Sequence, residues 1–127
     1  MTLDRVGQIA VPVRDLERAV AFYRDALGVP FLFTAPPGLA FFRCGELSLM
    51  LSTPEAGAEP HHPSSTVIYF QVDDAHAAHA ALRDRGVPFL DEPHVVHRAP
   101  DFELWMAFFR DPDENMLAVM ARKPVRA

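Results

Sequence analysis

The stretch that decides the fold is QIAVPVRDLERAVAFYRDALG, at residues 8–28. Its first part alternates between two faces, which predicts a strand over Gly7 to Val13. The part that follows carries apolar residues at helical spacing. It begins after Asp15, a natural N-cap, and ends before Gly28, which suits the position just past a helix. The fold therefore opens with a strand that runs directly into an amphipathic helix.

The same order of elements recurs in the second half of the chain. A second helical stretch has Asp73 or Asp74 as its cap and Gly86 as its stop. Two short runs occur once in each half: VPFL at 29–32 and 87–90, and FFR at 41–43 and 108–110. Each FFR run leads through a turn into an apolar strand. Each half thus follows the order strand, helix and three strands, which predicts a duplicated βαβββ unit.

The boundaries of the two units follow from composition. Module one covers residues 5–53 and module two covers residues 66–122. Between them, residues 53–65 are rich in Pro, Gly, Ala and Glu and lack periodicity, which is typical of a linker. At 127 residues the chain has the length of one domain. We expect a single α+β domain in which the two modules form a curved mixed sheet around a cleft.

Composition and charge exclude several classes of function. Half of the residues are hydrophobic and the net charge is −5, so a folded core is expected and a nucleic-acid partner is not. The chain contains no apolar run long enough to span a membrane, and its first residues lack the features of a secretory signal. The lone Cys44 cannot form an internal disulfide, which fits a reducing cytoplasm.

Two motifs carry a family resemblance. Residues 8–28 closely resemble the opening of vicinal-oxygen-chelate proteins, the family of glyoxalases, bleomycin-resistance proteins and ring-cleaving dioxygenases. The run FRDPDEN at 109–115 resembles the closing hairpin of that family, usually Asp-Pro-Asp-Gly-Asn. Glu114 stands where the family turn prefers glycine, so Asn115 is expected to take the left-handed conformation instead. The resemblance implies the fold more strongly than any one activity, because the family includes both enzymes and binding proteins.

The resemblance also implies where a metal would lie. In metal-dependent members each module supplies one ligand from its first strand and one from its last. The matching positions here are Gln8, Met50, Val67 and Ala118. Val67 and Ala118 cannot coordinate a metal, and a thioether suits none of the hard cations of the family. We therefore expect no metal and no other cofactor, and a tightly bound divalent ion would contradict this interpretation.

The side chains that remain in the expected cleft are mostly apolar. The candidate ligand-binding residues are Gln8, Ser48, Met50, Val67, Tyr69, His94, Met106, Phe108 and Ala118. Such a methionine-lined trough with a few polar groups suits a flat, apolar or cationic small molecule. The alternative is that these side chains simply fill a closed core.

The hairpin over residues 91–105 holds the candidates for acid–base chemistry. A histidine near a carboxylate is what a general base requires, and His94 with Glu103 forms the candidate pair. His94 and His97 are three residues apart, so on a regular strand they would face opposite ways. The plainer interpretation is an exposed hairpin with solvated charges. On the second helix, His76 and His79 are expected at the surface.

Three functions compete at this point. The first is a metal-free protein that binds a small molecule, as in the bleomycin-resistance branch. The second is a lyase, isomerase or dioxygenase that uses a non-standard site with His94 and Glu103. The third is a structural or regulatory subunit with a vestigial cleft. A homodimer is expected in all three cases, because a twofold partner would cover the exposed sheet edges and apolar surface.

Overall fold

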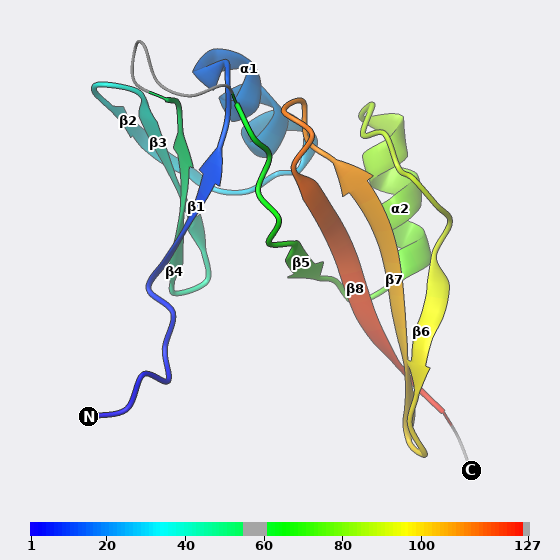
Figure 1. The fold of residues 1–127 in the computed structure, drawn as a ribbon. Coiled ribbons are helices and arrows are strands. Elements are labelled where there is room, and N and C mark those ends of the chain that lie inside the picture. The colour runs from blue at the N-terminus through cyan, green and yellow to red at the C-terminus, as the bar shows by residue number, and fades with distance from the viewer. Residues whose placement is uncertain (55–60, 126–127) are drawn as a thin grey trace. The chain divides into compact units, whose positions relative to one another are not determined.

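The computed structural model describes residues 1–54 and 61–125, and these fall into two compact units, residues 1–64 and 65–127. Each unit has the predicted order of strand, helix and three strands, so the duplicated βαβββ fold is confirmed (Figure 1). Of the expected linker, residues 55–60 lie outside the described residues. No helix in the described part of the chain is both long and apolar enough to cross a membrane.

The N-terminal unit (residues 1–64) is a four-stranded sheet with one helix. Its elements are β1 (Gln8–Pro12), α1 (Leu16–Ala21), η1 (Phe22–Ala26), β2 (Phe31–Ala35), β3 (Leu39–Cys44) and β4 (Leu47–Ser52). The sheet order is β1-β4-β3-β2, in which only the β1–β4 pair is parallel. The helix begins at the expected cap, since the Asp15 carboxylate accepts a hydrogen bond from the N–H of Arg18 at 3.1 Å. It widens into a π-helical turn, η1, before Gly28 at φ 77°.

The C-terminal unit (residues 65–127) repeats this plan. Its elements are β5 (Ile68–Gln71), α2 (Ala75–Asp84), β6 (His94–Arg98), β7 (Phe102–Arg110) and β8 (Met116–Pro124), and the sheet order is β5-β8-β7-β6. Of the two predicted caps for α2, Asp74 is the one used: its carboxylate accepts from the N–H groups of His76 and Ala77. The last strand continues to Pro124, which still pairs with Phe102.

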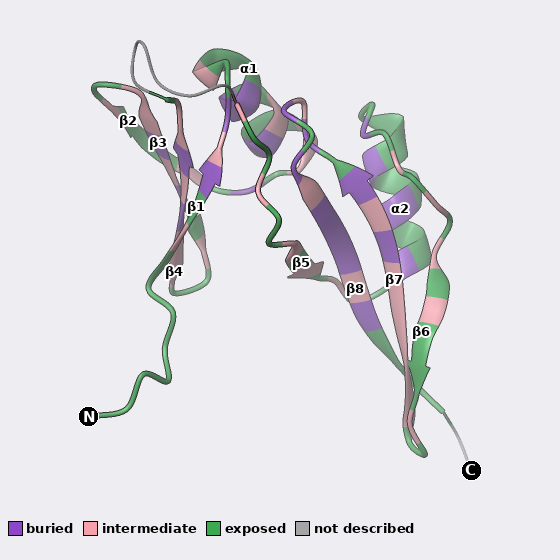
Figure 2. Cartoon of the chain, viewed as in Figure 1, coloured by how far each residue is buried: buried purple, intermediate pink, exposed green. Residues whose placement is uncertain are grey.

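Each helix covers one face of its own sheet, and the core of each unit lies between them. In the N-terminal unit Tyr23 and Phe42 are fully buried, with ring centres 6.0 Å apart. In the C-terminal unit Phe109 and Leu117 are buried beneath α2. The opposite face of each sheet, called the open face below, is less buried, and the two faces alternate along β7 and β8 (Figure 2).

Two predictions about single residues are wrong. His79 is only 5% exposed, and its ring packs on Phe89 with centres 4.3 Å apart, because α2 turns this residue toward the sheet. His76 is exposed as expected. In the turn before β8 the left-handed residue is Glu114, at φ 68°, and not Asn115. The Asp111 carboxylate holds both the backbone N–H and the side-chain amide of Asn115, so the reversal falls on the residue before it.

Candidate functional site

The open face of the C-terminal unit carries a cluster of aromatic rings. Strand pairing places Tyr69, Ala118 and Phe108 side by side across β5, β8 and β7. The Phe108 ring lies between two others: its centre is 5.9 Å from that of Tyr69, edge to face, and 6.4 Å from that of His94, with the two planes inclined at 30°. Tyr69, on the edge strand β5, is 43% exposed. These three rings form an accessible aromatic surface, called the platform below.

Methionine and amide side chains border the platform. Met106 lies beside His94 in the β6–β7 pairing, and Met120 lies between Met106 and Gln71 in the next register row. Methionine adapts its shape to irregular partners, and the Gln71 amide can both donate and accept hydrogen bonds. The predicted residues Tyr69, His94, Met106, Phe108 and Ala118 therefore do share one face. Val67, half-buried, lies one residue before β5 begins.

The loop before β6 holds the His94 ring in place. Its Nδ1 lies 3.0 Å from the carbonyl oxygen of Glu92 and 3.6 Å from Oδ2 of Asp91. The other oxygen of Asp91 accepts the backbone N–H of Phe108 at 2.8 Å. Asp91 therefore ties the loop to the central strand and also faces the imidazole. Sequence reasoning missed this residue, although its place three positions before His94 was a signal.

Glu103 lies elsewhere. Strand pairing sets it opposite Lys123, on the face that α2 covers, whereas His94 is opposite Met106 on the open face. Its carboxylate instead accepts a hydrogen bond from Arg98 Nε at 2.9 Å. That hydrogen bond is the chief reason that the pKa of Glu103 is lowered, against a smaller opposing effect of burial. The structure thus does not bring Glu103 to His94, and the carboxylate near His94 is Asp91.

A β-bulge changes the direction of His97. The pairing of β6 with β7 slips between Val95 and His97, so that His94 is opposite Met106 and His97 is opposite Leu104. Both partners lie on the open face, so the two histidines share that face, and the expectation that they face opposite ways is wrong. The extra residue, Val96, absorbs the alternation that a regular strand would have kept.

The open face of the N-terminal unit carries the remaining predicted residues. Gln8 pairs with Ser48, and its amide nitrogen lies 3.8 Å from the Met50 sulfur. Beside Met50, the rings of Phe41 and Phe33 stack with centres 4.9 Å apart, and Phe33 is 52% exposed. The sequence signal for the Phe33–Phe41 pair was the alternation of β3, which puts Phe41 on the face opposite to that of the buried Phe42. This face too is apolar and accessible.

The side chains at the family's metal positions do not fit a metal. Ala118 is fully buried and, like Val67, offers only hydrocarbon, while the amide of Gln8 is turned toward a thioether. Hard divalent cations need several oxygen or imidazole ligands. In residues 1–54 and 61–125 there is also no group of three or more His, Cys, Asp or Glu side chains arranged to hold an ion.

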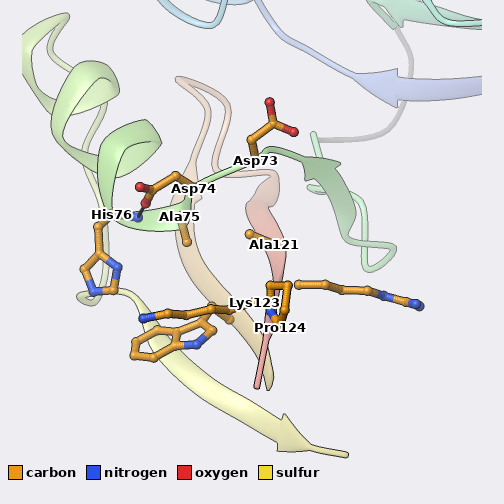
Figure 3. A pocket seen from close by; sticks show the side chains of 9 residues that line it. Asp73, Asp74, Ala75, His76, Ala121, Lys123 and Pro124 are labelled. Carbon is orange, nitrogen blue, oxygen red and sulfur yellow. Dashed lines mark hydrogen bonds between the residues drawn. The ribbon is translucent and has the colours of Figure 1, made fainter. Parts of the chain in front are cut away.

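A cavity lies on the helix side of the C-terminal unit, at the start of α2. It has a volume of about 230 Å³ and is lined by Asp73, Asp74, Ala75, His76, Trp105, Ala121, Arg122, Lys123 and Pro124. Figure 3 shows Lys123 and Pro124 on one side of it and the acidic pair at the helix start on the other. Backbone N–H groups, first that of Ala77, hold the pKa of the Asp74 carboxyl below its ordinary value. This carboxylate is thus engaged in capping α2.

Comparison with known proteins defines the class. A family model described as the Glyoxalase/Bleomycin resistance protein/Dioxygenase superfamily matches residues 5–119. The chain belongs to this superfamily, as its two sheets and their strand order indicate. Among individual proteins, it is 29% identical over 126 residues to the uncharacterized protein YraH of Bacillus subtilis (strain 168), a match that covers 88% of this chain and 94% of YraH.

Two solved structures illustrate the range of the superfamily. The chain is 28% identical to TnmS3, an antibiotic binding protein from Streptomyces sp. CB03234, with a TM-score of 0.73 and coverage of 98% of this chain and 99% of that one. It is 26% identical to a lactoylglutathione lyase from Agrobacterium tumefaciens, with a TM-score of 0.70 and coverage of 93% of each chain. One relative is thus a binding protein and the other an enzyme.

Proposed function

We propose that this protein binds a flat, apolar or cationic small molecule without a metal, on the open face of the C-terminal unit. The observation that carries the proposal is the platform, in which Phe108 lies between the rings of Tyr69 and His94. Aromatic rings attract flat ligands by stacking and attract cations through the negative face of the ring. The flexible Met106 beside them can adjust to the outline of the guest.

Two further observations support binding over metal chemistry. Hydrocarbon side chains stand at two of the four positions that hold the metal in metal-dependent relatives, Val67 and Ala118. The likeness to an antibiotic binding protein extends over almost the whole of both chains. An aromatic surface exposed in a single chain is, in addition, typical of a binding site.

The test is a titration with two fluorescent probes, proflavine as a flat cation and 2-methoxynaphthalene as a flat neutral molecule. Phe108→Ala is expected to weaken the binding of at least one probe about tenfold, since an aromatic pair contributes on the order of 1 kcal/mol beyond its buried area. Phe102→Ala, an equal truncation further along the same face of β7, is the matched control and should bind as the unchanged protein does. Equal affinity of the Phe108→Ala variant, or no binding by the unchanged protein, would refute the proposal.

An acid–base enzyme is the second candidate function, favoured by the contact of Asp91 with His94. In it His94 would act as the base, and the likeness to a lactoylglutathione lyase suggests the probe. The mark of this activity is uptake of solvent deuterium by S-lactoylglutathione at the carbon next to a carbonyl. The uptake must be absent with the His94→Ala variant.

We further propose a homodimer in the cytoplasm. Large apolar side chains are exposed in both units, among them Leu32, Phe33, Leu90 and Val96, and a second copy would cover some of them. The lone Cys44 cannot form an internal disulfide, which suits a reducing compartment. Light scattering at several concentrations tests the dimer, and a monomer at every concentration would contradict it.

A further inference from the structure

The loop before β6 is attached to the central strand through a side chain rather than only through its backbone. Phe89 bridges to Phe109, and the N–H of Leu90 donates to the Phe108 carbonyl at 2.8 Å. At the next step the Asp91 carboxylate takes the place of a backbone carbonyl and accepts the N–H of Phe108. The position of Asp91 is therefore set by the same residue whose ring forms the centre of the platform.

This arrangement favours the tautomer of His94 that carries its proton on Nδ1. Nδ1 faces two acceptors, the Glu92 carbonyl at 3.0 Å and the Asp91 carboxylate at 3.6 Å, so the neutral ring is stabilised with its hydrogen on Nδ1. Nε2 then bears a lone pair. It lies across the ring from the loop, and the plane of the ring is inclined at 30° to that of Phe108. A neutral His94 thus offers a hydrogen-bond acceptor at the edge of an aromatic surface.

We propose that Asp91 and His94 select flat aromatic ligands that carry a hydroxyl group, that is, phenols. This inference rests on the proposed function. A phenol presents a ring to stack on Phe108 and an acidic O–H that can donate to Nε2 of His94. Its methyl ether keeps the ring and loses the donor. A carboxylate analogue is disfavoured for two reasons. It has no hydrogen to donate to Nε2 of His94, and the negative charge of Asp91 repels it.

The experiment compares three probes of one ring system: 2-naphthol, 2-methoxynaphthalene and 2-naphthoate, titrated by calorimetry at about pH 8, above the ordinary range of imidazole titration. The unchanged protein is expected to bind 2-naphthol about tenfold more tightly than the ether, which corresponds to one hydrogen bond. 2-Naphthoate is expected to bind most weakly. No preference for the naphthol would overturn the inference.

Variants separate the role of Nε2 from that of the ring. His94→Phe keeps a flat ring beside Phe108 but lacks Nε2, so the roughly tenfold preference for 2-naphthol over 2-methoxynaphthalene should fall to about one, whatever the change in overall affinity. His97→Phe, the same change on the same face, is the control and should keep the preference. A preference that survives in the His94→Phe variant would overturn the inference.

The role of Asp91 has a readout that does not depend on binding. In nitrogen-15 spectra of the imidazole ring, the unchanged protein should show protonated Nδ1 and unprotonated Nε2. Asp91→Asn, which retains an oxygen for the Phe108 N–H, should increase the share of the other tautomer and reduce the naphthol preference in parallel. An unchanged tautomer with an unchanged preference would remove Asp91 from the proposal.

The outcomes for the two proposals can be told apart. If 2-naphthol, its ether and proflavine all fail to bind, the platform is not a binding site and both proposals fail. If proflavine alone binds, the proposed function stands and the selection of phenols fails. If both bind equally, and Phe108→Ala weakens both, the proposed function stands and the selection of phenols fails.

Discussion

The imidazole ring of His79 lies on the ring of Phe89, with centres 4.3 Å apart and planes inclined at 54°. Phe89 in turn contacts Phe109, with centres 5.1 Å apart. This row of rings joins α2 to the central strand β7 through the start of the loop that carries Asp91. His79, a residue type of intermediate burial in proteins, is therefore part of the core in this unit.

Truncation of His79 is expected to destabilise the fold. His79→Ala would leave a cavity against Phe89 and lower the free energy of unfolding by about 2 to 3 kcal/mol. His79→Leu, which roughly conserves volume, should cost less than about 1.5 kcal/mol. Chemical denaturation measures both. Equal stability of the alanine variant and the unchanged protein would show that the ring contributes nothing to packing.

Replacement of Glu114 by glycine is expected to stabilise the protein. Glu114 sits at φ 68°, a conformation that costs a residue with a side chain on the order of 1–2 kcal/mol. Glycine would remove this strain, but it loses more backbone entropy on folding, which offsets part of the gain. The net gain in Glu114→Gly should be about 0.5 kcal/mol. Asn115→Gly is the contrasting variant, and it should be less stable because it loses the amide hydrogen bond to Asp111. Thermal unfolding should show a higher melting temperature for Glu114→Gly and a lower one for Asn115→Gly than for the unchanged protein. A change of the same sign in both variants would contradict this account of the turn.

The charge of Asp74 links stability to pH. Its pKa is lowered in the folded state, chiefly by the N–H of Ala77, so its contribution is present above the pKa of the unfolded chain and is lost as pH falls through the lower folded value. Asp74→Asn keeps a cap but no charge. Its stability should therefore decline less steeply between about pH 5 and pH 2 than that of the unchanged protein. Parallel curves for the two proteins would contradict this linkage.

Metal ions are expected to leave the protein unchanged. With Val67 and Ala118 at two ligand positions, Ni²⁺, Mn²⁺, Fe²⁺, Zn²⁺ or Mg²⁺ added after chelator treatment should not raise the melting temperature. A true site filled at a hundred times its dissociation constant would add about 2.7 kcal/mol, which is several degrees. Elemental analysis of gently purified protein is the companion measurement. About one ion per chain, together with a clear thermal shift, would refute the metal-free interpretation and point to glyoxalase- or dioxygenase-like chemistry.

The fold could be predicted because its signals are local and occur twice. The Asp15 cap, the glycines after each helix and the alternation of β1 each depend on a few neighbouring residues, and the second copy checks the first. The errors came where a particular side-chain contact, rather than a repeating pattern, decides the outcome. The burial of His79 depends on Phe89, and the left-handed residue in the turn depends on how Asp111 holds Asn115.

The site could be predicted only in part, for a related reason. Strict alternation is enough to place Tyr69, Met106 and Phe108 on one face. It could not foresee the bulge at Val96, which reverses the direction of every residue beyond it in β6. Nor could it find Asp91, because that residue lies in a loop whose course is set by hydrogen bonds to Phe108.

The strand order has a consequence for synthesis on the ribosome. In each unit the strand made last, β4 or β8, lies between the first strand and the third and pairs with both. Neither sheet can be completed before its final strand has emerged from the exit tunnel. The N-terminal unit can thus close while the second is still being translated, whereas the C-terminal unit must keep β5 unpaired until Met116–Pro124 has been made. Throughout that interval the apolar side chains of β5 and β7 are exposed. Chaperone binding, or rapid completion of the sheet, must then prevent their aggregation with other chains.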